Sequence, residues 1–136
     1  MTIRPAAAAD TGAVLALWAR SRSASASTRD TEASVARVIA AEALLVAELD
    51  GGEIAGALIA TSDGWRGNMY RLAVAPEHRR SGIARALVAA GEASLRARGV
   101  RWITALVARE DAVAVAVWQS AGYADDAAIA RFVKNL

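Results

Sequence analysis

Apolar and polar positions along this chain follow two periods, one typical of amphipathic helices and one typical of strands. In the segment Asp10–Arg20 the apolar residues Val14, Leu15, Leu17 and Trp18 recur at helical spacing, behind an Asp10 that can cap a helix. A second amphipathic segment ends at Ala41, with either Asp30 or Thr31 as its cap and with Val35, Val38 and Ile39 on its apolar face. The N-terminal part therefore predicts two helices, joined by a polar, small-residue loop over 21–28.

Short apolar runs bounded by turn residues predict strands. The expected strands are Thr2–Arg4, Ala43–Leu49, Glu53–Thr61, Asn68–Val74 and Trp102–Val107. The second and third of these flank Asp50-Gly51-Gly52, a turn sequence that predicts a hairpin. Pro76 ends the fourth, because proline cannot continue a ladder of hydrogen bonds.

The clearest helix begins at Gly82. Ile83, Leu87, Gly91 and Leu95 recur every four residues, and Gly99 suits the left-handed position that ends many helices. A strand before this helix and a strand after it predict a parallel crossover.

The C-terminal part is ambiguous. The stretch 112–117 alternates like a strand but is rich in alanine, which favours a helix. Because Asp111 can cap a helix and Gly122 can end one, we expect a helix over Asp111–Ala121, followed by a last hairpin through Tyr123 and Phe132. The fold class is therefore α/β (α+β), a mixed sheet flanked by about four helices.

Composition narrows the possible functions. A chain of 136 residues fits a single domain over 1–136. With no cysteine and only one histidine, His78, we expect no disulfide, no cysteine nucleophile and no metal site. No apolar run is long enough to span a bilayer, and Met1–Pro5 lacks the apolar core of a signal peptide. We expect a cytoplasmic protein with no membrane partner.

Arginine dominates the positive charge. Of the 16 basic residues all but Lys134 are arginine, and eight lie between Arg66 and Arg101. Guanidinium groups pair bidentately with phosphoryl oxygens. A nucleic-acid partner is not expected, because the net charge is only +2 and exposed aromatic residues do not alternate with the basic ones.

The segment 74–85 joins a strand end to a helix start and can hold a phosphate. A helix start leaves backbone N–H groups unpaired and carries partial positive charge. Gly82 lets an anion approach the backbone, and Ala84 keeps the opening clear. Arg79, Arg80 and Arg85 can neutralise phosphate charge, so this segment predicts a diphosphate ligand.

Two spaced motifs carry a family resemblance. Arg79-x-x-Gly82-x-Ala84 resembles the coenzyme A motif of the GNAT acyltransferases, written (Arg/Gln)-x-x-Gly-x-(Gly/Ala). Asp111-x-x-Ala114-x-x-x-Trp118-x-x-x-Gly122-Tyr123 resembles that family's second motif. The resemblance covers nearly the whole chain and is greatest to small, single-domain bacterial members.

The resemblance implies a sheet splayed between the strands that end at Val74 and Val107, and acetyl-CoA as the donor. The implied cofactor-binding residues are Leu72, Ala73 and Val74, whose backbone pairs with the pantetheine arm, the N–H groups of Arg80, Ser81, Gly82, Ile83, Ala84 and Arg85, the Arg79 side chain, and Asp111 and Trp118 in the second motif.

The same resemblance assigns catalytic positions and shows departures. Asn68 stands where members commonly carry a glutamate base, and Trp118 stands where they carry a tyrosine acid. Tyr70 lies on the same strand face as Asn68 and is an alternative acid, while Glu110, Asp111 or Asp63 can take a proton through water. His78 has no serine partner in a motif, so we do not expect a catalytic triad.

We therefore expect direct transfer of an acetyl group from acetyl-CoA to a primary amine of a small molecule or peptide. Asn68 and Trp118 motivate an alternative, a non-catalytic acyl-CoA-binding or regulatory module. Either a monomer or a homodimer fits the sequence.

Overall fold

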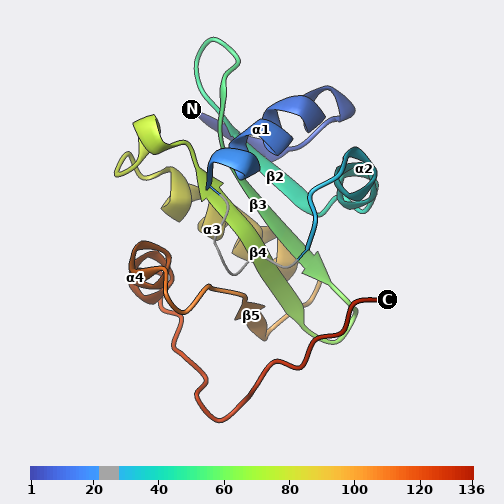
Figure 1. Ribbon diagram of the computed structural model, residues 1–136, viewed down its shortest axis with the longest axis vertical. Coiled ribbons are helices and arrows are strands. Elements are labelled where there is room, and N and C mark those ends of the chain that lie inside the picture. The colour runs from blue at the N-terminus through green and yellow to red at the C-terminus, as the bar shows by residue number, and fades with distance from the viewer. Residues whose placement is uncertain (22–27) are drawn as a thin grey trace.

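The computed structural model describes residues 1–21 and 28–136. Within them, five strands form one sheet in the order β1-β2-β3-β4-β5 (Figure 1). The strands are β1 Thr2–Pro5, β2 Leu44–Glu48, β3 Ile54–Ser62, β4 Gly67–Val74 and β5 Ile103–Ala105. The first four pair antiparallel, and β4 pairs parallel with β5. The predicted hairpin, the parallel crossover and the mixed α/β fold class are confirmed.

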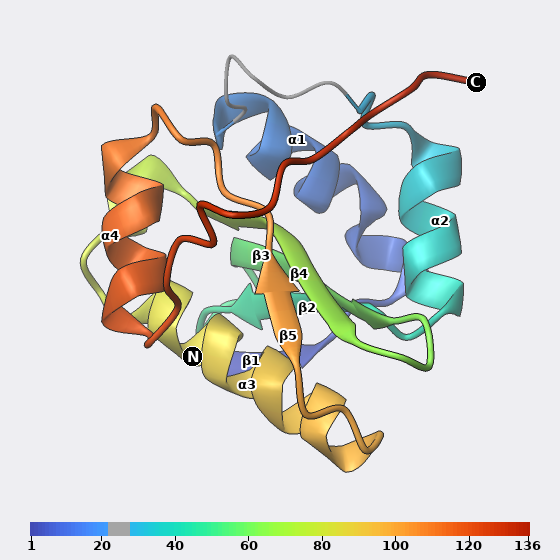
Figure 2. The ribbon, with the colours of Figure 1, turned by 90° about the horizontal axis from the view of Figure 1, so that it is seen from below.

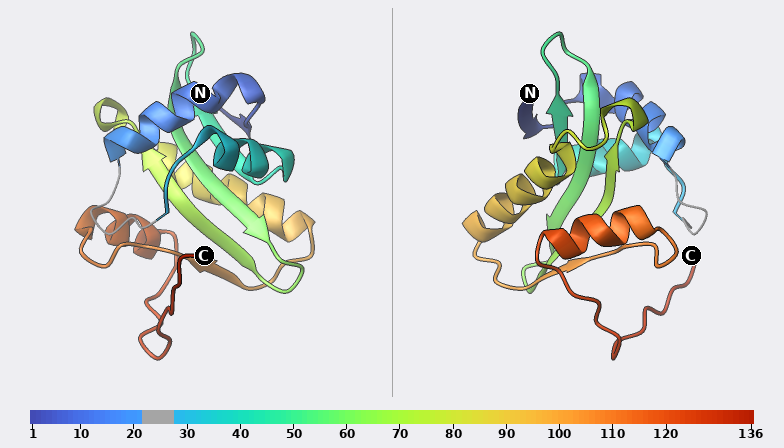
Figure 3. Two further views of the ribbon diagram at one scale, coloured as in Figure 1. Left: turned by 45° about the vertical axis from the view of Figure 1, so that its right-hand side comes forward. Right: turned by 90° about the vertical axis from the view of Figure 1, so that its left-hand side faces the viewer.

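Helices cover both faces of the sheet (Figures 2 and 3). They are α1 Thr11–Ser21, α2 Glu32–Ala40, α3 Ile83–Ala97 and α4 Ala112–Ser120, with 3-10 turns η1 Ala8–Asp10 and η2 Pro76–His78. α1 and α2 pack on one face in a core that contains Val14, Leu17 and Val35. α3 packs on the other face, and α4 adds its Trp118 to that second core.

α3 lies unusually close to the sheet because one of its core positions is a glycine. A Cβ atom at Gly91 would lie 2.8 Å from Met69 Sδ and 3.1 Å from Leu58 Cδ2. The other predicted core residues of this helix, Ile83, Leu87 and Leu95, are all buried. The helix face read from the four-residue repeat is confirmed, as is its end at Gly99, where φ is +84°.

The last hairpin was a wrong prediction. Residues 121–136 contain no strand, and Phe132 is 95% exposed. Ile129, Phe132 and Val133 do not follow a two-residue period, so they offer no apolar strand face to bury. In Figure 2 this C-terminal segment, drawn in red, follows α4 as a chain without a helix or strand.

The expected cap of α1 was also wrong. Asp10 lies in η1, and its carboxylate accepts hydrogen bonds from Arg4 Nη1 and Nη2 at 2.8 and 2.9 Å and from the Ala7 N–H at 2.7 Å. The Arg4 side chain is the main reason that the pKa of Asp10 is lowered. This partly buried ion pair attaches β1 to the start of α1. Thr31 caps α2, its hydroxyl accepting from the Ser34 N–H at 3.1 Å.

Two tryptophans, Trp18 and Trp65, have different environments. Trp18 is buried, whereas Trp65 is 83% exposed on the turn between β3 and β4. Asp63 shapes that turn by accepting from the N–H groups of Trp65 and Arg66. Most of the expected loop over 21–28 lies outside the described residues.

Candidate functional site

β4 and β5 separate halfway along β4. Their ladder consists of Gly67↔Ile103, Asn68↔Thr104 and Met69↔Ala105, and the Leu106 N–H still donates to the Met69 carbonyl oxygen at 3.0 Å. β4 then continues to Val74 beside β3 alone. The strand predicted over 102–107 is therefore shorter than expected, because β5 diverges. Among the described residues, no strand pairs with the second edge of β4 from Tyr70 to Val74.

A β-bulge at Arg71 changes which way the β4 side chains point. Ile59 pairs with Tyr70 and Ala57 with Ala73, so Leu58 alone opposes two residues of β4. Arg71 has φ of +57°, and its carbonyl oxygen accepts from Trp18 Nε1 at 3.2 Å. Its guanidinium lies 5.3 Å from the centroid of the Trp18 ring and pairs with Asp30. These contacts from α1 and from the segment before α2 hold the bulge in place.

The loop after β4 brings a helix start beside this open edge. Gly82 is the residue before α3, with φ of +85°, and a Cβ atom placed there would meet no heavy atom within 4 Å. Regular helical bonding begins when the Ala86 N–H donates to the Gly82 carbonyl oxygen at 3.0 Å. The N–H groups of residues 83–85 precede it and point out of the helix start. Arg79, Arg80 and Arg85 are exposed around it. We call residues 79–85 the cradle.

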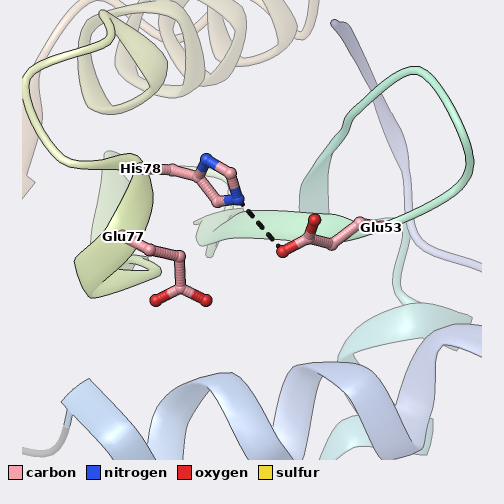
Figure 4. Close-up of side chains that lie close together, drawn as sticks. All are labelled: Glu53, Glu77 and His78. Carbon is pink, nitrogen blue, oxygen red and sulfur yellow. Dashed lines mark hydrogen bonds and ion pairs between the residues drawn. The ribbon is translucent and has the colours of Figure 1, made fainter.

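Two side-chain contacts to other elements fix the loop that carries the cradle. His78 Nε2 and Glu53 Oε1 lie 3.1 Å apart, joining η2 to the residue before β3 (Figure 4). Arg20 Nη1 donates to both carboxylate oxygens of Glu77, at 3.0 and 3.2 Å, joining η2 to α1. The Ser81 hydroxyl donates to the His78 carbonyl oxygen. His78, considered for catalysis, is therefore an anchor of this loop.

Asn68 and Tyr70, two predicted catalytic residues, lie two positions apart on β4 before the bulge. Tyr70 packs against the core of α1 and α2, whereas Met69 between them packs against that of α3. Asn68 Oδ1 accepts from Thr104 Oγ1 at 2.6 Å, across the last part of the β4–β5 ladder. Thr104 was missed by the sequence reasoning, because only the register of the parallel strands brings it beside Asn68.

Trp118, the third predicted catalytic residue, lies elsewhere. It belongs to the core on the α3 face, is 4% exposed, and meets the Tyr123 ring in a T-shaped contact with centroids 5.0 Å apart. The Tyr123 hydroxyl donates to Glu92 Oε1 at 3.1 Å, and burial raises the pKa of Tyr123. Trp118 therefore lies on the face of the sheet opposite Tyr70.

The carboxylates considered as proton acceptors are engaged in local structure. Asp111 Oδ1 accepts from the Ala114 N–H at 3.0 Å, so Asp111 caps α4 as predicted. The N–H of Arg66, followed by that of Trp65, lowers the pKa of Asp63, which makes it a weak base. Glu110 is exposed just before α4.

A pocket of about 230 Å³ opens on the α1–α2 face beside Tyr70. It is lined by Trp18, Thr28, Arg29, Asp30, Ser34, Arg37, Val38, Ile59 and Tyr70. Ser34 and Arg37, the polar residues that α2 adds to this lining, were missed by the sequence reasoning. Surface polar residues on a helix look alike in sequence, and only the packing of α2 beside β4 turns these toward a common space.

The splayed strand pair beside a helix start that can accept an anion agrees with the GNAT resemblance, and a pocket opens on the other face of the opened strand. The model of the Acetyltransferase (GNAT) family matches residues 13–123, and the chain belongs to that family. Within the ranges that the structure describes, no helix is long and apolar enough to cross a membrane.

Relatives and solved structures agree with this assignment. An acetyltransferase from Photorhabdus laumondii is 40% identical over 81 residues, which are 60% of this chain and 56% of that protein. The chain thus spans just over half the length of the curated relatives that it matches.

Two solved structures share the fold. An aminoglycoside 6'-N-acetyltransferase from Acinetobacter haemolyticus superposes with a TM-score of 0.76 at 23% identity, over 100% of this chain and 99% of that one. A Mycobacterium tuberculosis protein in complex with CoA and NLQ gives a TM-score of 0.77 at 17% identity, over 90% of this chain and 70% of that one.

Proposed function

We propose that this protein transfers an acetyl group from acetyl-CoA to the primary amine of a small molecule or peptide. The observation that carries the proposal is the open edge of β4 from Leu72 to Val74, which lies next to the cradle. An unpaired strand edge offers a row of backbone groups that a pantetheine arm can pair with, as an added strand would. A helix start beside it supplies N–H groups for phosphate.

The residues present fit such a donor. The N–H groups of residues 80–85 would receive the pyrophosphate, and the open space at Gly82 leaves room for phosphate oxygens to reach them. Arg79, Arg80 and Arg85 would balance the phosphate charge from the rim of the cradle. Membership of the GNAT family and the CoA complex of a protein with the same fold support this assignment.

When bound, acetyl-CoA supplies an activated acetyl thioester. Polar side chains near the splay include Asn68 and Thr104, which pair within the ladder, and Tyr70, which follows it. Thr104 fixes the Asn68 amide, so Asn68 orients a polar partner on the acceptor side but cannot take a proton at neutral pH. The Tyr70 hydroxyl is the proton-carrying group that β4 presents to the α1–α2 face, and we assign it proton donation; water takes the proton that the amine loses.

In this proposal Asp111 and Trp118 position α4, and they do not bind the acetyl donor. The Asp111 cap and the packing of Trp118 against Tyr123 fix α4 beside the splay. The Trp118 indole can donate a hydrogen bond but is not a useful acid. Its burial is consistent with a role in positioning α4.

The test is release of free CoA and mass spectrometric detection of acetylated amine, with acetyl-CoA and a panel of primary amines. We expect turnover by the wild-type protein and a fall in kcat of about 100-fold for Tyr70→Phe, with an unchanged Kd for acetyl-CoA. Unchanged kcat in Tyr70→Phe would remove Tyr70 from the reaction.

Asn68 in the place of a carboxylate favours a second candidate, a module that binds acyl-CoA without catalysis. Tight binding of acetyl-CoA with no product from any amine would support this second candidate and exclude the first. Absence of acetyl-CoA binding would exclude both.

A further inference from the structure

The pocket beside Tyr70 carries an unusual balance of charge for an amine-binding site. Its charged lining residues are Arg29, Asp30 and Arg37. Asp30 forms an ion pair with Arg71, the bulge residue of β4, so its negative charge is balanced from within the protein. Among the described residues, neither Arg29 nor Arg37 forms an ion pair with a carboxylate. In the part of the chain that the structure describes, the pocket therefore presents two arginine side chains that have no ion-pair contact with a carboxylate.

The two arginines reach this space from different elements. Arg29 lies in the segment before α2, and Arg37 lies in the last turn of α2. Both side chains are exposed, and Arg37 Nη2 donates to the Ser34 hydroxyl at 3.4 Å. Because Ser34 also lines the pocket, this contact places the Arg37 guanidinium over it.

The pocket belongs to the acceptor side of the molecule. Ile59 and Tyr70 form its floor from the sheet, on the face that α1 and α2 cover. The cradle begins α3, whose core lies on the opposite face. Tyr70 is also the first residue of β4 beyond the ladder with β5, so a molecule in the pocket would meet the splay at this side chain.

We propose that the acceptor is an amine that also carries an oxyanion, a carboxylate or a phosphoryl group, which Arg29 and Arg37 bind while the amine points past Tyr70 toward the splay. This inference rests on the proposed acetyl transfer and specifies its substrate class. Guanidinium groups bind both kinds of oxyanion through paired N–H donors. A polycationic acceptor would bring ammonium groups against the two arginines, so an aminoglycoside is disfavoured although proteins with this fold acetylate such molecules.

The experiment compares amines that differ only in the anionic group. β-Alanine is paired with β-alaninamide, and O-phosphoethanolamine with ethanolamine, each assayed at equal concentrations of the unprotonated amine. We expect kcat/KM to be at least tenfold higher for one or both anionic members, and the better of the two identifies the oxyanion. The preference should weaken as ionic strength rises, because the arginines are exposed.

Charge-removing variants assign the preference to the pocket. Arg37→Gln and Arg29→Gln should each raise KM for the preferred anionic amine by about tenfold or more, and should raise KM for its neutral partner much less. Arg96→Gln removes the same charge from the last turn of α3, on the other face, and should change neither. Equal effects of the Arg37 and Arg96 variants, or equal kcat/KM for the members of both pairs, would overturn the proposal.

Failure of the two proposals can be told apart. If the wild-type protein acetylates neutral and anionic amines equally, the oxyanion proposal fails while acetyl transfer stands. If no amine is acetylated, calorimetric titration of both anionic amines into the acetyl-CoA-saturated protein decides the oxyanion proposal alone. Binding that Arg37→Gln abolishes supports it, and no binding, or binding that the variant leaves unchanged, refutes it.

Discussion

Replacing Gly82 by alanine separates the conformational cost of this position from its role in ligand binding. Gly82 has φ of +85°, a left-handed conformation that costs a residue with a Cβ atom about 1–2 kcal/mol. No heavy atom lies within 4 Å of the position that the new Cβ would take, so no steric term adds to this cost in the free protein. We expect Gly82→Ala to fold, with a Tm lower by roughly 3–10 °C.

Gly82→Ala should also weaken acetyl-CoA binding. The added methyl group occupies the space through which a phosphate would approach the N–H groups of residues 83–85. At an acetyl-CoA concentration of 100 times the wild-type Kd, binding stabilises the wild-type protein by about 2.7 kcal/mol. If the methyl group weakens binding tenfold, the same concentration stabilises the variant by only about 1.4 kcal/mol.

Gly99 provides a matched control at the other end of the same helix. Its φ is +84°, and a Cβ atom there also meets nothing within 4 Å. Gly99→Ala should therefore lose the same stability but keep the full acetyl-CoA-induced rise in Tm. Thermal unfolding of the three proteins, each with and without acetyl-CoA, measures both quantities. If the two variants gain equally from acetyl-CoA, the cradle does not bind the pyrophosphate.

Two further predictions concern stability. Gly91→Ala should lower the free energy of unfolding by about 1–3 kcal/mol in chemical denaturation, because its Cβ would lie 2.8 Å from Met69 Sδ. As a control, the Cβ of Gly12→Ala in α1 would meet nothing within 4 Å, and this variant should gain roughly 0.5–1 kcal/mol. Equal effects of the two substitutions would contradict the close packing of α3. Asp10→Asn should lose about 1–3 kcal/mol at pH 7. Because Arg4 lowers the folded-state pKa of Asp10, the stability that the carboxylate contributes is present above about pH 4 and is lost as the pH falls through the folded-state pKa. The difference in stability between the two proteins should therefore shrink in acid. A difference that stays constant with pH would show that the carboxylate charge is not involved.

Much of the fold follows from the sequence because neighbouring residues decide it. The four-residue repeat of Ile83, Leu87, Gly91 and Leu95 determines which face of α3 is buried, since the geometry of a helix fixes the spacing. The cap at Asp111 and the end at Gly99 depend on backbone groups within a few residues. The prediction of a C-terminal hairpin was wrong because a hairpin needs an apolar face to bury, and residues 121–136 do not supply one.

The cradle could be predicted from the sequence only in part. Its residue types, a glycine opening a helix among arginines, are visible in the sequence and predict an anion site. Its position beside the open edge of β4 is a tertiary property, because it depends on where β4 stops pairing with β5 and on the contacts of Glu77 and His78 with distant elements.

The sequence by itself determined the order of the elements, the buried face of α3, the helix start at Gly82 and the family resemblance, since each depends on local spacing. Only the tertiary structure decided how the residues of the acceptor side come together. Three features join segments that are distant in the chain. They are the bulge at Arg71, the contact of Thr104 with Asn68, and the position of Arg29 and Arg37 in one pocket with Tyr70. No local pattern records such contacts, because strand register and helix packing create them.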